Sequence, residues 1–388
     1  MKKITSNLLF KVVVAITLGI VLGTVLPESI GRIFATFNAL FDQLLKFLIP
    51  LIIVGLIIPA IAKLGNTAGK MLLATVAIAY GSTLFSGFST YFASIAIFPS
   101  LIDTHVANSI VNEAAGLSPY FTIEIPPFFD VMSALVFSFL VGIGLSRLTN
   151  SKLAAVMFDF EEIVSFIIEK VIIPLLPLFI FGIFLDMTYS GKVMLILNVF
   201  IKIIGIIFAL HIILLLIQFI IAGAIAKKNP FKLLATLLPA YFTALGTQSS
   251  AATIPVTLTQ VKKTGVSEEV ASFVVPLCAT IHLAGSTLKI VACVVALMLM
   301  QGMPIDFGLM AGFICMLGVT MVAAPGVPGG AIMAAIGIIA SMLGFNIENQ
   351  ALMISLYIAM DSFGTACNVT GDGAIAIVID KLFQKKTN

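Results

Sequence analysis

The sequence contains no tryptophan, only four cysteines and very little charge. The cysteines form no C-x-x-C pair and lie in apolar stretches, which argues against a disulfide framework and against a zinc site. Only 10% of the residues are charged, whereas a soluble chain carries roughly a quarter. No hydrophilic block is long enough for a soluble domain, and a net charge of +3 is too small to indicate nucleic-acid binding. Since 60% of the 388 residues are hydrophobic, most of the surface is expected to face lipid.

Six apolar runs are long enough to predict membrane-spanning helices, each of which needs about 20 mostly apolar residues. The first run follows two lysines and lacks a small-x-small cleavage site, so we expect an uncleaved span rather than a signal peptide. The runs cover roughly residues 8–27, 38–62, 71–98, 129–148, 163–187 and 193–226.

Basic residues occur on alternate sides of these runs. Lysine and arginine follow the second, fourth and sixth runs and close the chain, whereas the polar interval 99–128 carries acids and no lysine or arginine. Positive charge marks the cytoplasmic side of a membrane. We therefore expect a multi-pass protein of the cytoplasmic membrane, with both termini in the cytoplasm and the acidic loop outside.

After about residue 229, polar residues, glycine and proline interrupt the apolar pattern. In lipid, broken backbone persists only where it is buried in protein or lines a cavity. Two breaks at corresponding positions of successive hairpins are typical of an inverted repeat around a solute site. The alternative is a pair of ordinary helices kinked by proline. The interruptions are T-Q-S-S-A-A-T-I-P-V-T at 247–257, A-A-P-G-V-P-G-G-A at 323–331 and D-S-F-G-T-A-C-N-V-T-G-D at 361–372.

Four motifs follow one another in the C-terminal half: S-S-A-A-T-I-P-V-T at 249–257, P-L-C-A-T-I-H-L-A-G-S-T at 276–287, G-V-P-G-G at 326–330, and the run at 361–372. With these motifs, the chain resembles the dicarboxylate/amino acid:cation symporter family from its first span to about residue 381. The resemblance implies an all-α polytopic membrane protein with eight transmembrane helices and two re-entrant hairpins in inverted repeats. It also implies a homotrimer in the lipid bilayer.

The resemblance further implies a scaffold and a mobile transport domain. In such transporters the second domain moves against the first in an elevator motion, with hairpin two as the outer gate. The implied divisions are 1–70 (scaffold spans one and two), 71–98 (span three, transport domain), 99–190 (extracellular loop and scaffold spans four and five) and 191–388 (core transport domain). The last division would hold span six, hairpin one (about 229–264), broken span seven, hairpin two (about 305–346) and span eight.

Polar residues of the last helix are suited to bind a small amino acid. Asp361 lies in an otherwise apolar helix, where an ionised carboxylate is costly and usually functional. The resemblance assigns it to the substrate's amino group. Asn368 lies two turns along the same face, can donate to a carboxylate and can accept from a cation. Thr365 faces the same way, and Asp372 matches a sodium-coordinating carboxylate. A polar stripe that only packs against another helix is the alternative.

The two hairpin tips supply the other expected substrate contacts. Ser249 and Ser250 offer hydroxyl and backbone N–H groups near a half-helix terminus, which suits an α-carboxylate. Glycine in the second hairpin lets its backbone approach the ligand closely. The expected binding residues are completed by Gln248, Ser286, Gly326, Val327, Pro328, Gly329 and Gly364.

Two of these positions depart from the family pattern. Carriers of acidic amino acids keep an arginine that clamps the side-chain carboxylate, either in the last helix or at the tip of hairpin one. Gly364 and Gln248 stand at those positions, and neither replaces a bidentate guanidinium. This favours a neutral amino acid or a carboxylate that is anchored differently.

Residues that bind sodium in relatives are also replaced. The family signature N-M-D-G-T in span seven reads H-L-A-G-S here, so that His282 stands for the asparagine and Ala284 for the aspartate. Sodium needs several oxygen ligands, and losing an aspartate removes charge compensation. We expect at least one sodium site to be absent, with a residual site at Asn368 and Asp372 as the remaining candidate.

Span seven carries two basic residues of its own. Lys289 is either a lysine that extends to the membrane surface or a built-in positive charge where relatives recruit sodium. His282 is either structural or a second such charge. Both Lys289 and His282 are candidate partners for Asp372. If His282 titrates near neutral pH, transport is coupled to protons. If Lys289 stays charged, transport is uncoupled or an exchange. Thr280 completes the expected coupling residues, and no cofactor is expected.

These features predict a secondary transporter, and not an enzyme, that carries a small amino acid or carboxylate with reduced or absent sodium dependence. A conventional sodium- or proton-coupled symporter is the alternative within the class. A channel is the alternative outside it, but a channel needs a continuous polar pore, whereas the polar residues cluster in the last third of the chain. An intramembrane enzyme is disfavoured because the H-E-x-x-H, G-x-S-x-G and paired-aspartate protease patterns are missing.

Overall fold

A computed structural model describes residues 8–66, 70–102, 116–148, 150–191, 193–324 and 328–383. The described residues form α-helices with one short 3₁₀ segment, one π segment and no strand. Six helical segments among them are long and apolar enough to cross a bilayer. Large apolar side chains lie exposed on several helices. The expected all-α polytopic fold is therefore confirmed.

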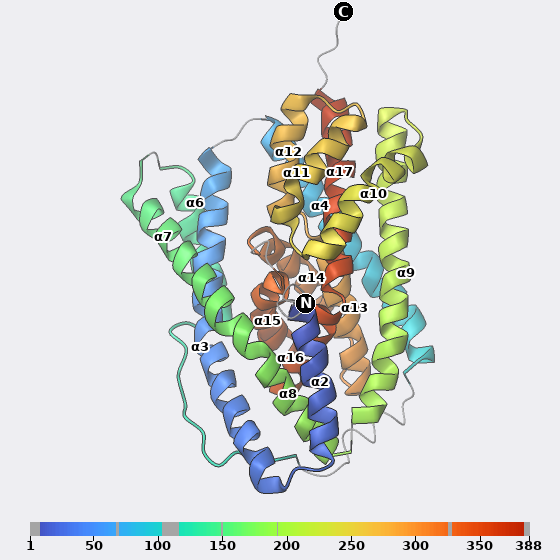
Figure 1. Cartoon of the computed structure of the whole chain (residues 1–388). Helices are drawn as coiled ribbons and strands as arrows, with labels where there is room; N and C mark the ends of the chain where they lie inside the picture. The colour runs from blue at the N-terminus through green and yellow to red at the C-terminus, as the bar shows by residue number, and fades with distance from the viewer. Residues whose placement is uncertain are drawn as a thin grey trace, which may run out of the picture.

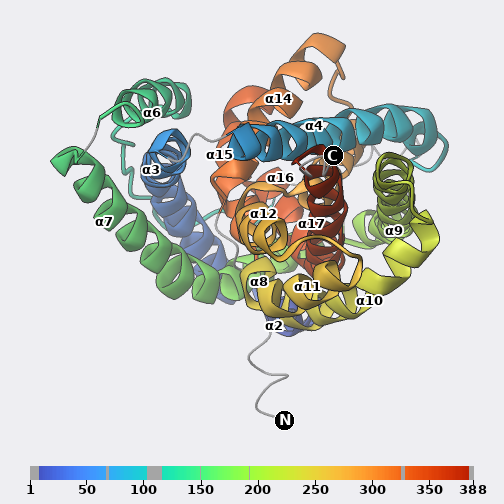
Figure 2. The ribbon, with the colours of Figure 1, turned by 90° about the horizontal axis from the view of Figure 1, so that it is seen from above.

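Helices from the N-terminal half pack on one another and form one side of the molecule (Figures 1 and 2). Small residues bring two of them close together, since a Cβ on Gly19 would lie 2.7 Å from the backbone oxygen of Phe181. The first and fourth spans have 16 and 15 residues, so they are shorter than expected for a bilayer of about 30 Å. The helices are α2 (Leu8–Gly23), α3 (Glu28–Asn66), α6 (Val131–Leu145), α7 (Lys152–Ile167) and α8 (Ile173–Tyr189), with the π segment η2 (Ile168–Ile172) between the last two.

The remaining helices form a second group around α17 (Asp361–Phe383). α17 contacts α4, α9 to α13 and α16, and Figure 2 shows it enclosed by these neighbours. Nearly all of its side chains are buried. The other members are α4 (Lys70–Ile97), α9 (Val193–Ala226), α10 (Pro230–Thr247), α11 (Ser250–Lys263), α12 (Glu268–Ile281), α13 (Ala284–Met300), α14 (Phe307–Val322), α15 (Gly330–Leu343) and α16 (Ile347–Ala359), with the 3₁₀ segment η1 (Phe98–Ser100) after α4.

The last third of the chain repeats one arrangement twice. A helical hairpin, α10–α11 and then α14–α15, is followed by two helices with a short break between them, α12–α13 and then α16–α17. The first break falls at His282 and Leu283, within the span that the resemblance implies to be broken. The second falls at Met360, so that Asp361 begins a helix. The prediction that Asp361 lies inside a helix is therefore wrong. Such breaks are tolerated where protein surrounds them, and a carboxylate in the first helical turn interacts favourably with the helix dipole.

Helices α14 to α16 contact the N-terminal group. At the contact between α15 and α3, Gly337 lies so close to Ile49 that their Cβ positions would be 3.7 Å apart. A cleft of about 930 Å³ lies beside this contact, lined by α3, by the segment before α6 and by α15 and α16. In Figure 1, α2 and α3 extend below the second group, whereas α12 and α17 extend above α3.

Candidate functional site

Both hairpin tips meet the first turn of α17. At the tip of hairpin one, Nε2 of Gln248 donates to Oγ of Ser362 over 2.7 Å. At the tip of hairpin two, the backbone N–H of Gly329 donates to Oδ2 of Asp361 over 2.8 Å. Asp361 is only 4% exposed. The start of α17 is therefore the place where the two repeats meet around a buried carboxylate.

A buried lysine is the second partner of that carboxylate. Nζ of Lys289, on α13, lies 3.1 Å from Oδ1 of Asp361, 3.5 Å from the backbone oxygen of Met360 and 3.6 Å from the ring centroid of Tyr357. An ammonium group has three N–H donors, and these three acceptors surround it. Lys289 is fully buried, so it does not extend to the surface, and it pairs with Asp361 rather than with Asp372.

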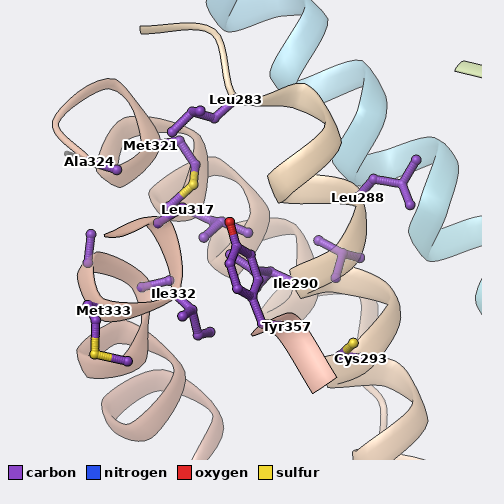
Figure 3. Packing of buried hydrophobic residues seen from close by; sticks show 14 of the residues in the cluster. Leu283, Leu288, Ile290, Cys293, Leu317, Met321, Ala324, Ile332, Met333 and Tyr357 are labelled. Carbon is purple, nitrogen blue, oxygen red and sulfur yellow. The ribbon is translucent and has the colours of Figure 1, made fainter. Parts of the chain in front are cut away.

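Gly364 leaves the space that Lys289 occupies. A Cβ at this glycine would lie 2.6 Å from Nζ of the lysine and closer still to Cε. A side chain at this position, one of the two where the resemblance implies an arginine, would therefore collide with the lysine as it lies here. Figure 3 shows the Tyr357 ring, which covers the lysine, among apolar side chains of hairpin two and α13. The hydroxyl of Tyr357 donates to Oγ of Ser286 over 3.0 Å.

A second buried pair lies further along α17. Nδ1 of His282 lies 2.9 Å from Oδ1 of Asp372, and Nε2 lies 3.1 Å from Oγ of Ser82 on α4. That hydroxyl accepts a bond of 3.0 Å from Nε2 of Gln218 on α9. Its own proton is thus available for Nε2, which fits a neutral imidazole that donates from Nδ1 to Asp372. Histidine is the side chain best suited to change charge near neutral pH.

The surroundings of this histidine contain few other groups that can titrate. A cavity of about 320 Å³ between α4, α9 and α17 is lined mainly by apolar side chains and reaches Ser82 and Gln218. Oε1 of Gln218 is buried and has no hydrogen-bond partner. Besides His282, the titratable side chains that interact electrostatically with Asp372 are Cys278 and Cys367.

Oxygen atoms expected to hold a sodium ion are bonded to the chain's own donors. Oδ1 of Asn368 accepts from the backbone N–H groups of Gly285 and Ser286 over 2.7 and 3.3 Å, and Nδ2 donates to Oγ of Ser286 over 3.1 Å. Oδ1 of Asp372 is bonded to His282. Sodium requires several oxygen ligands that point toward it, and Oδ1 of each of these two residues is already used in bonds within the chain.

Most of the expected binding residues gather near the start of α17. Ser249 is the N-cap of α11, where its side chain accepts from the backbone N–H of Ala252. Ser250 and Thr365 are buried, and Pro328 is half-buried beside Gly329. Two expected residues of hairpin two, Gly326 and Val327, lie outside the described residues.

Thr280 is placed differently from the other expected coupling residues. Its side chain is exposed and donates to the backbone oxygen of Leu277 on its own helix. The structure therefore does not join it to His282 or Asp372. Among the residues that the structure describes, no three His, Cys, Asp or Glu side chains come together as a metal site.

Four residues that contribute side-chain contacts to the site were not expected from the sequence: Tyr357, Ser362, Ser82 and Gln218. Tyr357 lies four residues before Asp361, and a tyrosine one turn from a buried acid is a usable signal. Gln218 is an amide in the apolar second half of helix α9, and polar side chains inside a membrane span are usually functional. Ser82 carries no such signal, because serine is common in membrane helices.

Two hairpins and two broken helix pairs around a buried charged centre define a multi-pass membrane protein of the transporter class. The sequence profile of the sodium:dicarboxylate symporter family matches residues 8–382, and the chain belongs to this family. The family consists of transporters, in agreement with the expectation that the chain is not an enzyme.

Individual relatives lie at about one quarter identity. The chain is 27% identical over 300 residues to excitatory amino acid transporter 2 of Homo sapiens, an alignment that covers 73% of this chain and 51% of that protein. It is 27% identical over 258 residues to an excitatory amino acid transporter of Caenorhabditis elegans, an alignment that covers 64% of this chain and 50% of that protein. The chain thus spans about half the length of these relatives. It is 27% identical over 355 residues to the serine/threonine transporter SstT of Acinetobacter baumannii, with 87% of each chain covered.

Proposed function

We propose that this chain is a secondary transporter that carries a small amino acid or carboxylate across the membrane by an elevator motion, with internal basic residues replacing at least part of a sodium requirement. The observation that carries the proposal is the meeting of both hairpin tips at Asp361. A solute can reach this buried point only if a hairpin tip moves, which is the behaviour of a gated carrier and not of an open pore.

Two bases support the reduced need for sodium. Lys289 and His282 each bond an acid of α17, so the buried carboxylates have positive or hydrogen-bonding partners within the chain. An uncompensated buried acid would otherwise require a cation. We infer that Lys289 supplies a fixed charge and that His282 supplies one that changes with pH, which makes proton coupling or exchange the expected modes.

Uptake into proteoliposomes tests this function. The purified chain is supplied with labelled amino acids and dicarboxylates in sodium buffer and in buffer with choline in its place. We expect saturable uptake and counterflow exchange that persist without sodium. Strict sodium dependence would contradict the internal-charge proposal, and flux that neither saturates nor shows counterflow would indicate a channel.

The elevator motion is supported by the close contact of α15 with α3, which joins the two groups of helices. A disulfide needs Cβ atoms about 3.5–4.5 Å apart, and the Cβ positions of Gly337 and Ile49 are 3.7 Å apart. We expect oxidised Ile49→Cys/Gly337→Cys protein to lose transport and to regain it on reduction. The matched pair Gly87→Cys/Ile314→Cys, also 3.7 Å apart but within the second group, should transport in both states. Equal transport by the two oxidised pairs would argue against the motion.

We further infer a homotrimer in the cytoplasmic membrane, with scaffold and transport domains as expected from the sequence and both termini in the cytoplasm. The basic residues after the second, fourth and sixth spans support this orientation. Native mass spectrometry of the detergent complex should give three chains. Terminal tags should be cleaved by protease only when it is added from the cytoplasmic side.

A further inference from the structure

Two buried acids of α17, Asp361 and Asp372, each have a base of their own. Asp361 pairs with Lys289 over 3.1 Å, and Asp372 pairs with His282 over 2.9 Å. All four residues are at most 4% exposed. Both bases come from the segment α12–α13 and both acids come from α17. A solute that enters between the hairpins therefore meets a region whose negative charges are already paired.

A zwitterionic amino acid would bring a second ammonium group to this region. Once it loses its water, that group needs an anionic partner. One oxygen of Asp361 is bonded to Lys289 and the other to the backbone N–H of Gly329. A further ammonium at Asp361 would place two cations against one carboxylate in a buried site, where like charges repel strongly.

Lys289 has no ready alternative position. Its ammonium group has three partners, Asp361, the backbone oxygen of Met360 and the Tyr357 ring. Displacing it would leave a buried charge without its counter-ion, which is strongly unfavourable. Its place also depends on the missing side chain at Gly364, so the surrounding residues are matched to the lysine.

We propose that Lys289 is a tethered ammonium group that fills the subsite of an amino acid's ammonium, so that the solute of this carrier is a carboxylate without an ammonium group. This inference rests on the transporter function proposed above and narrows its solute class. Donors at the hairpin-one tip, including the N-terminus of α11, remain suited to the solute's carboxylate because they need no additional cation. Lys289 is thereby a specificity-determining residue.

Matched solutes that differ in one ammonium group test the proposal. The full-length protein is reconstituted in liposomes that contain one unlabelled compound, and exchange with the same labelled compound is measured for aspartate and succinate, serine and 3-hydroxypropionate, and alanine and propionate. We expect at least one deaminated compound to exchange about tenfold or more faster than its amino acid, which corresponds to about 1.4 kcal/mol. An amino acid that exchanges as fast as its deaminated partner would overturn the proposal and leave the transporter function intact. If none of the six compounds exchanges, the proposed transporter function fails as well.

Variants assign the preference to the lysine. Lys289→Met keeps an unbranched side chain but frees Asp361, so the preference should shift toward the amino acid of each pair. Lys202→Met, at an exposed lysine of α9, is the matched control and should keep the wild-type preference. If Lys289→Met does not fold, Lys289→Met/Asp361→Asn removes the uncompensated acid as well. That variant should favour neither member of a pair, and an unchanged preference in it would overturn the role of Lys289.

Discussion

The two buried pairs of the second helix group are built alike and differ in what surrounds them. Lys289–Asp361 lies at the start of α17, is bonded to the tip of hairpin two and is covered by Tyr357. His282–Asp372 lies further along the same helix and continues through Ser82 to Gln218, which line a cavity. Both pairs are buried, but the first contacts the tip of hairpin two, whereas the second connects through Ser82 and Gln218 to a cavity between helices.

This difference separates two ways to compensate a buried acid without a metal ion. A lysine gives a charge that stays, and it lies where both hairpins meet and a solute would bind. A histidine gives a charge that can change with pH, and it lies away from hairpin two. We infer that the lysine pair sets which solute fits and that the histidine pair sets how transport responds to protons. Four changes would break or sharpen this comparison.

The largest effect is expected from Lys289→Ala. Removing one partner of a buried ion pair costs about 3–5 kcal/mol because the remaining charge has no counter-ion. Lys289→Ala/Asp361→Ala removes both charges and should recover most of that loss. Unfolding by denaturant in detergent measures both, with Lys202→Ala as the exposed control. A loss for Lys289→Ala no greater than that of the control would show that the pair is not held as described.

A smaller loss is expected at His282, which separates stability from proton response. His282→Ala removes a hydrogen bond to a carboxylate, worth about 1.5–3 kcal/mol. His282→Asn keeps a donor toward Asp372 and should unfold later than the alanine variant, but it has no group to protonate. Lower pH favours the imidazolium, which compensates Asp372, so uptake by the wild type should rise as pH falls.

Uptake in proteoliposomes across a pH series measures this response. His282→Asn should show none of the rise, whereas His211→Gln, whose amide can keep the donor that Nε2 offers to the backbone oxygen of Gly285, should show all of it. A rise that survives in His282→Asn would place proton coupling elsewhere in the chain.

Gly364→Ala tests the lysine pair from its opposite side. The new Cβ would lie 2.6 Å from Nζ of Lys289, and overpacking of this kind costs about 1–3 kcal/mol. Gly205→Ala, at a helical glycine of α9 with open space around it, should be neutral or slightly stabilising. In the Lys289→Ala background the cost of Gly364→Ala should disappear. Thermal unfolding in detergent gives all four values, and an equal cost in both backgrounds would contradict the contact.

The sequence was sufficient to predict the helical spans and both hairpins, because lipid requires long apolar runs and leaves polar breaks only inside the protein. That span seven is broken followed only from the family resemblance, without a position for the break. The break at Met360 was not predicted, since no glycine or proline marks it. It follows from tertiary packing, which puts Asp361 at a helix start where hairpin two can bond it.

The sequence predicted which residues form the candidate site better than it predicted which base pairs with which acid. Asp361, Lys289, His282 and Asp372 each stood out as ionisable groups in apolar segments. Which base meets which acid depends on the rotation of α13 against α17, and spacing along one helix does not give that rotation. The close approach of Gly285 to the backbone of α17 and the missing side chain at Gly364 decide it.

The smallest effect is expected from Ser82→Ala on the histidine pair. This change removes the hydroxyl that bonds Nε2 of His282 and accepts a hydrogen bond from Nε2 of Gln218. One such neutral hydrogen bond contributes about 0.5–1.5 kcal/mol. Ser89→Ala on the same helix removes a hydroxyl that bonds only the backbone oxygen of Ser86, so it is the matched control. Because Nδ1 of His282 still bonds Asp372, the rise of uptake at low pH should persist in Ser82→Ala, but it should begin at a different pH from that of the control. A pH profile identical to that of Ser89→Ala would mean that the proton response of the His282–Asp372 pair does not depend on Ser82.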